Sequence, residues 1–126
     1  AAIHWAVRAQ PLPALSSAEA ELYGLSSAVC DLLGFVNVLE EFQIAFDGPV
    51  SVLVDSRGAR LLAEDAAASA RTRHVHRRWY FVSHYINDGL IKLVAVKGVH
   101  NAANFLTKAV AGEAFVRDRA YSMGIQ

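Results

Sequence analysis

The chain has 126 residues, of which 54% are hydrophobic and 19% are charged. This length predicts one domain, residues 1–126, and the composition predicts a globular, soluble chain rather than a disordered or membrane-spanning one. Twelve basic and twelve acidic residues cancel, so net charge neither favours nor excludes a polyanionic partner. The single cysteine, Cys30, excludes an internal disulfide. We expect it to be a buried structural thiol in an intracellular, reducing compartment.

The first two elements are read from side-chain periodicity. Residues 2–9 alternate loosely and contain β-forming side chains, which predicts a strand that ends before the following prolines. A long helix is predicted over residues 16–44, because Ser16 and Glu19 make a capping box at its start. Its apolar side chains then recur every three or four positions, as one continuous stripe. The stripe consists of Leu22, Leu25, Val29, Leu32, Val36 and Leu39.

Short strands and helices make up the rest of the chain, after a turn at residues 47–49. The apolar runs predict strands at residues 50–54, buried on both faces, and at residues 90–96. Helices are predicted at residues 56–64, 73–87, 102–108 and 113–123. Because a connection through helices usually returns the chain in the same direction, the two strands are expected to pair in parallel. The order of elements therefore predicts an α/β fold.

Two carboxylates occupy positions that could meet at one edge of such a sheet. Glu21 lies in the first turn of the long helix, and Asp55 follows strand 50–54. Paired acids of this kind hold divalent metal against a phosphodiester in nucleases. Each acid also has a structural interpretation, since Asp55 could cap the next helix and Glu21 could complement the helix dipole. Glu19 is better explained by the capping box.

A basic run precedes two aromatic residues, Trp79 and Tyr80. It contains no acidic residue, which favours a surface that tracks phosphates, although a solvated helix face is the alternative. Its histidines two positions apart diverge by about 200° on a helix, so a zinc site is not expected there. His100 is interpreted as a surface residue. The candidate nucleic-acid-binding residues are Arg71, Arg73, His74, Arg77 and Arg78.

Several common catalytic motifs are absent from the sequence. It has no glycine-rich phosphate loop, nucleophile elbow, His-Glu-x-x-His or Cys-x-x-Cys. Acyl transfer, nucleotide hydrolysis and zinc chemistry therefore lose their best support.

Five short motifs occur in one order along the chain. They are residues 16–23 (Ser-Ser-Ala-Glu-Ala-Glu-Leu-Tyr), 54–56 (Val-Asp-Ser), 71–75 (Arg-Thr-Arg-His-Val), 88–89 (Asp-Gly) and 104–108 (Asn-Phe-Leu-Thr-Lys). The ordered set resembles the ribonuclease H domain at the end of copia-type retrotransposon polyproteins, from about residue 3 to residue 124. This resemblance implies a ribonuclease H-like fold, with a mixed five-stranded sheet flanked by helices. It also implies hydrolysis of the RNA strand of an RNA/DNA hybrid, by two magnesium ions held on four carboxylates.

The resemblance carries over only part of the family's metal site. Glu21 matches the family's helix glutamate and Asp55 the aspartate that ends its fourth strand, so both are expected to be catalytic residues and metal ligands. The family's last aspartate falls on Asn104, a neutral oxygen ligand. Its first aspartate has no counterpart, because this chain begins near the third strand and lacks the first β-hairpin. We therefore expect magnesium to bind weakly or not at all, and the chain as given to be inactive.

The missing hairpin also predicts a structural gap. In the family's sheet, the third strand reaches the fourth strand, here residues 50–54, only through the two strands of the first hairpin. Without that hairpin a gap of three strand spacings opens, about 14 Å at roughly 4.8 Å each. Proteins rarely leave an apolar strand edge unpaired, so a partner chain or an upstream segment is expected to complete the sheet. The expected ligand is an RNA/DNA hybrid or another nucleic acid, with no membrane involved. Two alternatives are a retroelement-derived remnant serving as a structural subunit of a larger assembly and a nucleic-acid-binding module without cleavage.

Overall fold

The computed structural model describes residues 2–11, 13–45, 47–55, 58, 73–107 and 109–125, apart from the side chains of residues 73–76 and 107. Over these residues the chain is mixed helix and strand. The elements in chain order are α1 (Ser17–Glu41), β1 (Val50–Asp55), α3 (Arg73–Asn87), β2 (Ile91–Val96), a 3₁₀ turn (Gly98–His100), α4 (Asn104–Thr107) and α5 (Glu113–Met123).

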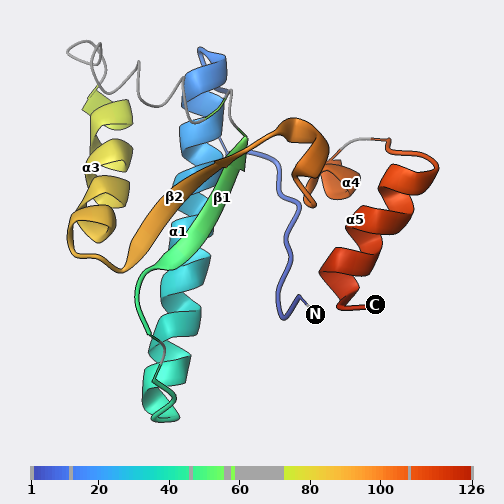
Figure 1. The fold of residues 1–126 in the computed structure, drawn as a ribbon. Coiled ribbons are helices and arrows are strands. Elements are labelled where there is room, and N and C mark those ends of the chain that lie inside the picture. The colour runs from blue at the N-terminus through green and yellow to red at the C-terminus, as the bar shows by residue number, and fades with distance from the viewer. Residues whose placement is uncertain are drawn as a thin grey trace.

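Strands β1 and β2 form a parallel two-stranded sheet, as predicted (Figure 1). Val50 lies opposite Ile91 and Asp55 opposite Val96, so the two strands are in register along their whole length. Both strands run towards the N-terminal half of α1. Their carboxyl ends therefore point to the part of α1 that carries Glu21.

The core lies where α1 packs against the sheet and α3. Helix α3 follows the predicted range, and its Val82 is fully buried. The apolar stripe of α1 is the largest contributor, as its spacing predicts. The buried cluster consists of Leu22, Leu25, Val29, Val82 and Ile91, with Val52, Val54 and Leu93 packed against it.

The start of α1 is fixed by two side-chain caps. Ser16 Oγ accepts a hydrogen bond from the Glu19 backbone N–H at 3.0 Å. Glu19 Oε2 accepts in return from the Leu15 N–H at 2.7 Å, one residue earlier than in a standard capping box. The length and composition of α1 alone would allow it to cross a membrane, a test that core helices also pass. Its packing in the buried cluster is that of a core helix.

Three expectations about local structure are wrong. Residues 2–9 are extended but form no strand in the described structure, because their one backbone hydrogen bond to a distant segment, from the Ala2 N–H to the Ser122 carbonyl of α5, does not continue into a ladder. Strand β1 is buried on one face only, since Ser51 and Leu53 point away from α1 and are exposed. Cys30 is exposed rather than buried. The predicted helix 56–64 lies outside the described residues, apart from Gly58.

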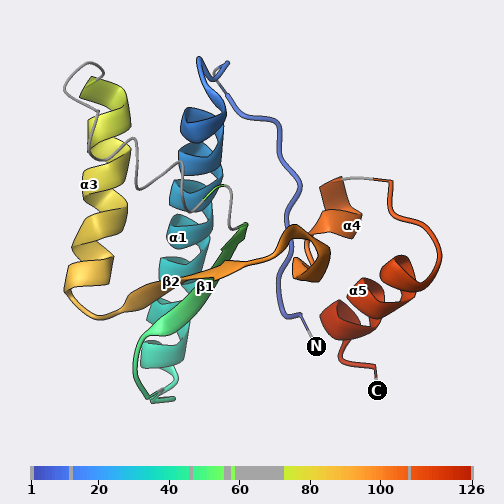
Figure 2. The same ribbon diagram turned by 45° about the horizontal axis from the view of Figure 1, so that its top comes forward.

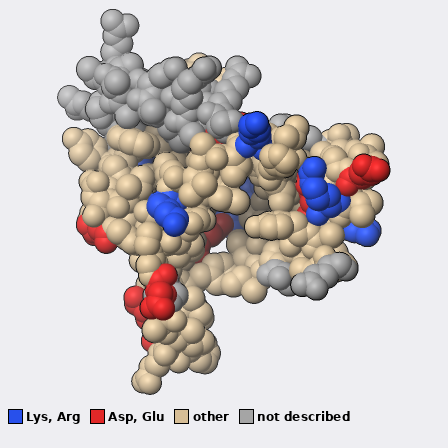
Figure 3. Space-filling model, in the orientation of Figure 1, with Lys and Arg blue, Asp and Glu red and all other residues tan. Residues whose placement is uncertain are grey.

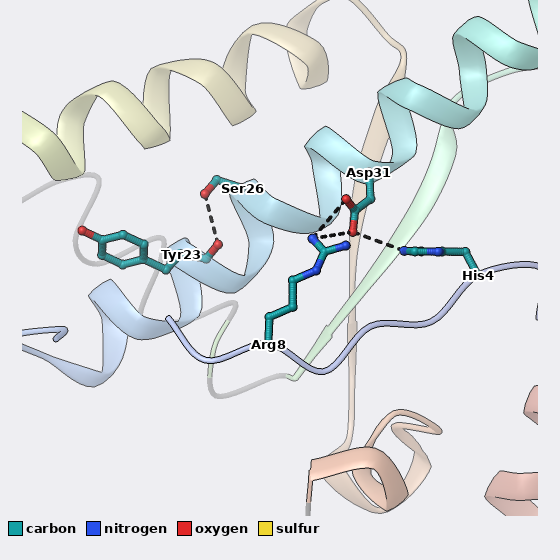
Figure 4. Close-up of polar contacts among 5 residues, drawn as sticks. All are labelled: His4, Arg8, Tyr23, Ser26 and Asp31. Carbon is teal, nitrogen blue, oxygen red and sulfur yellow. Dashed lines mark hydrogen bonds and ion pairs between the residues drawn. The ribbon is translucent and has the colours of Figure 1, made fainter. Parts of the chain in front are cut away.

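Residues 2–11 pass between α1 and the two C-terminal helices in both views of the ribbon (Figure 2). We call this segment the strap. Two of its basic side chains contact one carboxylate of α1, Asp31 (Figure 4). Gln10 Nε2 also donates to the Ala20 carbonyl at 2.9 Å. The strap therefore lies along α1 without being part of the sheet.

Candidate functional site

Asp55 is the last residue of β1, and its half-buried side chain lies beside the chain that leaves β2. A Cβ atom added to Gly98 would lie 3.4 Å from Asp55 Oδ2, so this carboxylate sits close to the backbone at residue 98. Gly98 is two residues beyond Val96, the partner of Asp55 in the sheet register. The parallel pairing thus brings the first candidate acid to the 3₁₀ turn.

Asn104 contacts the same 3₁₀ turn from the other side. Its Nδ2 donates a hydrogen bond to the Gly98 carbonyl. The next helix also holds this turn, because Arg117 Nη2 donates to the Val99 carbonyl at 2.6 Å. Asp55 and Asn104, 49 residues apart in the sequence, therefore both lie against Gly98.

Glu21 approaches the same end of β1 from α1. Its side chain is exposed, and a Cβ atom added to Gly58 would lie 3.0 Å from Glu21 Oε2. Gly58 is buried and lies three residues beyond Asp55. Glu21 thus lies beside residue 58, while Asp55 and Asn104 lie beside residue 98, so each candidate residue is close to the chain that continues from one of the two strands. We call Glu21, Asp55 and Asn104 together the acidic edge.

The acidic edge offers hard oxygen donors, which are the ligands that Mg²⁺ prefers. Within the described part of the chain, no group of three or more His, Cys, Asp or Glu side chains is arranged to hold a metal ion. Glu21 and Asp55 supply two carboxylates, and Asn104 adds a neutral amide that is already hydrogen-bonded through its nitrogen. The donors present therefore do not fit a centre with two magnesium ions.

The basic run divides into residues with different surroundings. Arg71 lies outside the described residues, and Arg73 and His74 lie in the first turn of α3 with side chains that are not described. Arg77 is exposed to solvent. Arg78 instead packs on α1: its guanidinium carbon lies 3.9 Å from the centre of the Tyr23 ring, and its Nη1 donates to Ser26 Oγ at 3.1 Å.

The contacts of Arg78 indicate a structural role that the sequence pattern did not predict. Tyr23 and Ser26 are both buried on α1, one turn apart, and the Ser26 hydroxyl donates to the Tyr23 carbonyl (Figure 4). The guanidinium of Arg78 therefore joins α3 to α1 by a cation–π contact and a charge-assisted hydrogen bond. Arg77 and Arg78 are therefore neighbours in α3 with different surroundings: Arg77 is exposed to solvent, and Arg78 contacts α1.

Replacing Arg78 with Ala should lower the free energy of unfolding by about 1–3 kcal/mol, because the cation–π contact and the hydrogen bond to Ser26 are both lost. Arg77→Ala should change it by less than about 0.5 kcal/mol, as for most exposed positions. Urea unfolding of the two variants measures the difference. Equal effects of the two substitutions would assign Arg78 to the solvated surface.

Sequence reasoning missed the contact between the strap and Asp31. The only signal was that His4, Arg8 and Gln10 are polar residues at even positions of a loosely alternating segment. The residues between them include Ile3, Trp5 and Val7, whose side chains are 81%, 67% and 63% exposed. The strap thus contacts α1 through its polar side chains and leaves its apolar side chains largely exposed.

A hollow of about 2340 Å³ is lined by the strap, α1 and β1, and also by residues of α3 and of the C-terminal helices. Most of its lining is apolar, and it is visible as a recess in the middle of the face in Figure 3. Val50 and Leu53 line it from the sheet, and Ile3, Trp5 and Val7 line it from the strap. Phe35 and Leu39 of α1 are among the other lining residues.

The chain is similar to three plant retrotransposon proteins. It is 28% identical over 114 residues to the retrovirus-related Pol polyprotein from transposon TNT 1-94 of Nicotiana tabacum. It is 26% and 25% identical over 113 residues to the Pol polyproteins from transposons RE2 and RE1 of Arabidopsis thaliana. Each match covers 90% of this chain and 8% of the relative. No protein-family model and no solved structure matches the chain.

These relatives are copia-type Pol polyproteins, and their similarity supports a retrotransposon origin for the chain. The chain spans about 8% of the length of the relatives it matches.

Proposed function

We propose that the chain is a ribonuclease H-like domain of retrotransposon origin that does not cleave nucleic acid by itself. The family activity is two-metal hydrolysis of the RNA strand of RNA/DNA hybrids. The acidic edge carries this proposal, because Glu21, Asp55 and Asn104 come from three separate elements and gather at the carboxyl ends of a parallel pair. Similarity to Pol polyproteins supports the retrotransposon origin in this proposal.

The charge of the acidic edge limits what metal it can hold. Glu21 and Asp55 bring two negative charges against four positive charges on two Mg²⁺ ions, and Mg²⁺ gives up its water reluctantly. Asn104 adds an oxygen but no charge. A single divalent ion, weakly bound between Glu21 and Asp55, is therefore the most that this edge supports.

Paramagnetic Mn²⁺ tests whether the two carboxylates share a cation. Added Mn²⁺ should broaden the NMR signals of Glu21 and Asp55 together, before those of other acidic residues, because broadening falls steeply with distance from the ion. Asp55→Asn should remove the effect at Glu21 as well. Asp88→Asn is the matched control, since Asp88 lies in a separate exposed contact with His84. Independent broadening of the two signals would mean that the carboxylates do not converge.

A partner segment that adds strands is the second part of the proposal. Val52 and Val54 of β1 pack towards the core under the sheet, while Ser51 and Leu53 face away. Side chains also alternate along the strap: its polar residues contact α1, and its apolar residues are exposed. Two extended segments thus lie over one helix with an apolar hollow between them. We propose that this hollow is a slot for strands supplied by an upstream segment or a partner chain.

Nucleic-acid binding without cleavage is the second candidate function. Arg77 is exposed on α3, and the aromatic ring of Tyr80, 68% exposed, lies on the same helix. Exposed arginine next to an aromatic ring suits phosphate contact and base stacking. A remnant that serves as a structural subunit needs no such surface. A test of nucleic-acid binding therefore distinguishes a binding module from a structural subunit.

Binding of a duplex oligonucleotide should depend steeply on salt and should run through the basic run. Each phosphate neutralised adds about −0.9 to the slope of log K against log salt for duplex DNA. Joint replacement of Arg73 and Arg77 by Ala should therefore flatten the slope by about 2. Lys92→Ala, an exposed cation on β2, is the control and should leave the slope unchanged. An unchanged slope in the double variant would assign the run to a plain solvated face.

A further inference from the structure

One carboxylate of α1 receives both basic side chains of the strap (Figure 4). Arg8 Nη1 lies 3.2 Å from each oxygen of Asp31, and His4 Nε2 lies 3.4 Å from Oδ2. The His4 ring also lies 5.4 Å from the ring of Phe35, centre to centre. Among the described residues, His4 and Arg8 are the charged or titratable side chains that contact Asp31. The contacts tie residues 4 and 8 of the strap to one point on α1.

The strap has little else to hold it along its length. It forms no ladder with the sheet, and Ile3, Trp5 and Val7 leave most of their apolar surface in water. Apolar burial is the main source of docking energy between segments, so a segment with its apolar side outwards gains little of it. The polar contacts with Asp31, the bond from Gln10 and, at the start of the strap, a backbone hydrogen bond from the Ala2 N–H to the Ser122 carbonyl therefore determine where the strap lies.

We propose that residues 2–11 are a releasable strap, anchored by Asp31, that forms the far wall of the slot and sets its width. This inference rests on the proposed slot for added strands. Contacts between exposed charged side chains are weak and are screened by salt. Such an anchor holds the strap in place while the slot is empty and lets it move when a strand enters. Asp31 is thus a positioning residue for the proposed partner.

The electrostatics of Asp31 agree with this role. The hydrogen bond from Arg8 lowers the pKa of the Asp31 carboxyl below its ordinary value of 3.8, with a smaller contribution from His4. A lowered pKa in the folded state means that the contact adds stability above the unfolded value and loses it as the pH falls through the folded one. The anchor is therefore fully charged near neutral pH and is released by acid.

A fluorophore at Cys30, the single cysteine of the chain, reports the position of the strap. Cys30 precedes Asp31 and Trp5 follows His4, and Cys30 and Trp5 line the same hollow, so the docked strap keeps this tryptophan on the side of the label. A bimane group on Cys30 should be quenched by Trp5 in the wild-type chain, and Trp5→Phe defines the unquenched emission. Asp31→Asn keeps the size of the side chain but removes its charge, and should raise the emission to that of Trp5→Phe.

Two further variants make the experiment decisive. Arg8→Gln should release the strap as Asp31→Asn does, because it removes the other half of the main contact. Asp88→Asn removes the contact between His84 of α3 and Asp88, the residue after that helix, and should leave the quenching unchanged. Far-UV circular dichroism checks that each variant keeps the helices. Quenching that persists in both Asp31→Asn and Arg8→Gln would overturn the proposal.

The readout needs no partner, which keeps the two proposals separate. A strap that stays docked without Asp31 overturns the anchor and leaves the addition of strands untouched. A slot that accepts no strand, with quenching lost in Asp31→Asn, leaves the anchor standing.

Discussion

Purified residues 1–126 should not cleave the RNA strand of an RNA/DNA hybrid with either Mg²⁺ or Mn²⁺. Among the described residues, the acidic edge lacks the charge needed to hold two ions, because Asn104 is neutral and only Glu21 and Asp55 are acids. Two-metal catalysis depends on both ions being held against the attacking and leaving oxygens. A labelled hybrid incubated with the chain and resolved on a denaturing gel measures this directly.

Metal-dependent cleavage that disappears in Asp55→Asn would contradict this expectation. Glu40→Gln is a matched control, because Glu40 is an exposed acid near the far end of α1. Any cleavage that survives both substitutions comes from a contaminant. The chain is expected to gain activity when a second polypeptide supplies further strands and an acid beside Asp55.

Asn104→Asp provides a sharper test of the same site. The Asn104 amide donates to the Gly98 carbonyl, and Asp55 Oδ2 lies against the same glycine. A carboxylate at position 104 loses that hydrogen bond and adds a like charge near Asp55, so without metal the variant should be less stable by roughly 1–3 kcal/mol. Millimolar Mn²⁺ should restore most of the loss. If Mn²⁺ stabilises the variant no more than the parent chain, position 104 does not belong to a metal site.

The structure shows which parts of the fold are encoded locally. The cap formed by Ser16 and Glu19, and the spacing from Leu22 to Leu39, were enough to predict α1, because both signals act within one helix. The range of α3 and the parallel pairing of β1 with β2 also agree with prediction. Glu21 and Asp55 could be placed near one edge because a helix start and a strand end have definite positions in such a layout.

The wrong predictions involve residues whose structure depends on a neighbour. Residues 2–9 have the composition of a strand, but hydrogen bonds to a second strand are what make one, and none lies beside them. The apolar side chains of its strand predict that Leu53 is buried, yet the described chain leaves it 48% exposed. Arg78 belongs to a basic run by sequence and to the α1–α3 contact by geometry. The periodicity of a sequence predicts which side chains share a face, but it does not predict which other segment packs against that face.

The same missing neighbour leads to the last prediction, that the chain is not a stable free monomer. Leu53 is 48% exposed, and Trp5, Ile3 and Val7 across the slot are more exposed still. Covering one apolar side chain contributes about 1.5–3 kcal/mol, so an uncovered slot removes several kcal/mol from a total of only about 5–15. Purified residues 1–126 should self-associate in sedimentation experiments.

Two variants separate an open slot from a weak core as the cause. Leu53→Thr combined with Trp5→Thr makes the slot polar and should reduce self-association, because these side chains are exposed and contribute little to the buried cluster. Val29→Ala removes fully buried apolar volume and should lower stability by about 1–3 kcal/mol without reducing association. A polypeptide that adds strands in the slot should make the chain monomeric, since the apolar side chains of the slot then gain a partner. A compact monomer that unfolds cooperatively with no added strand would show that the slot is merely a surface hollow.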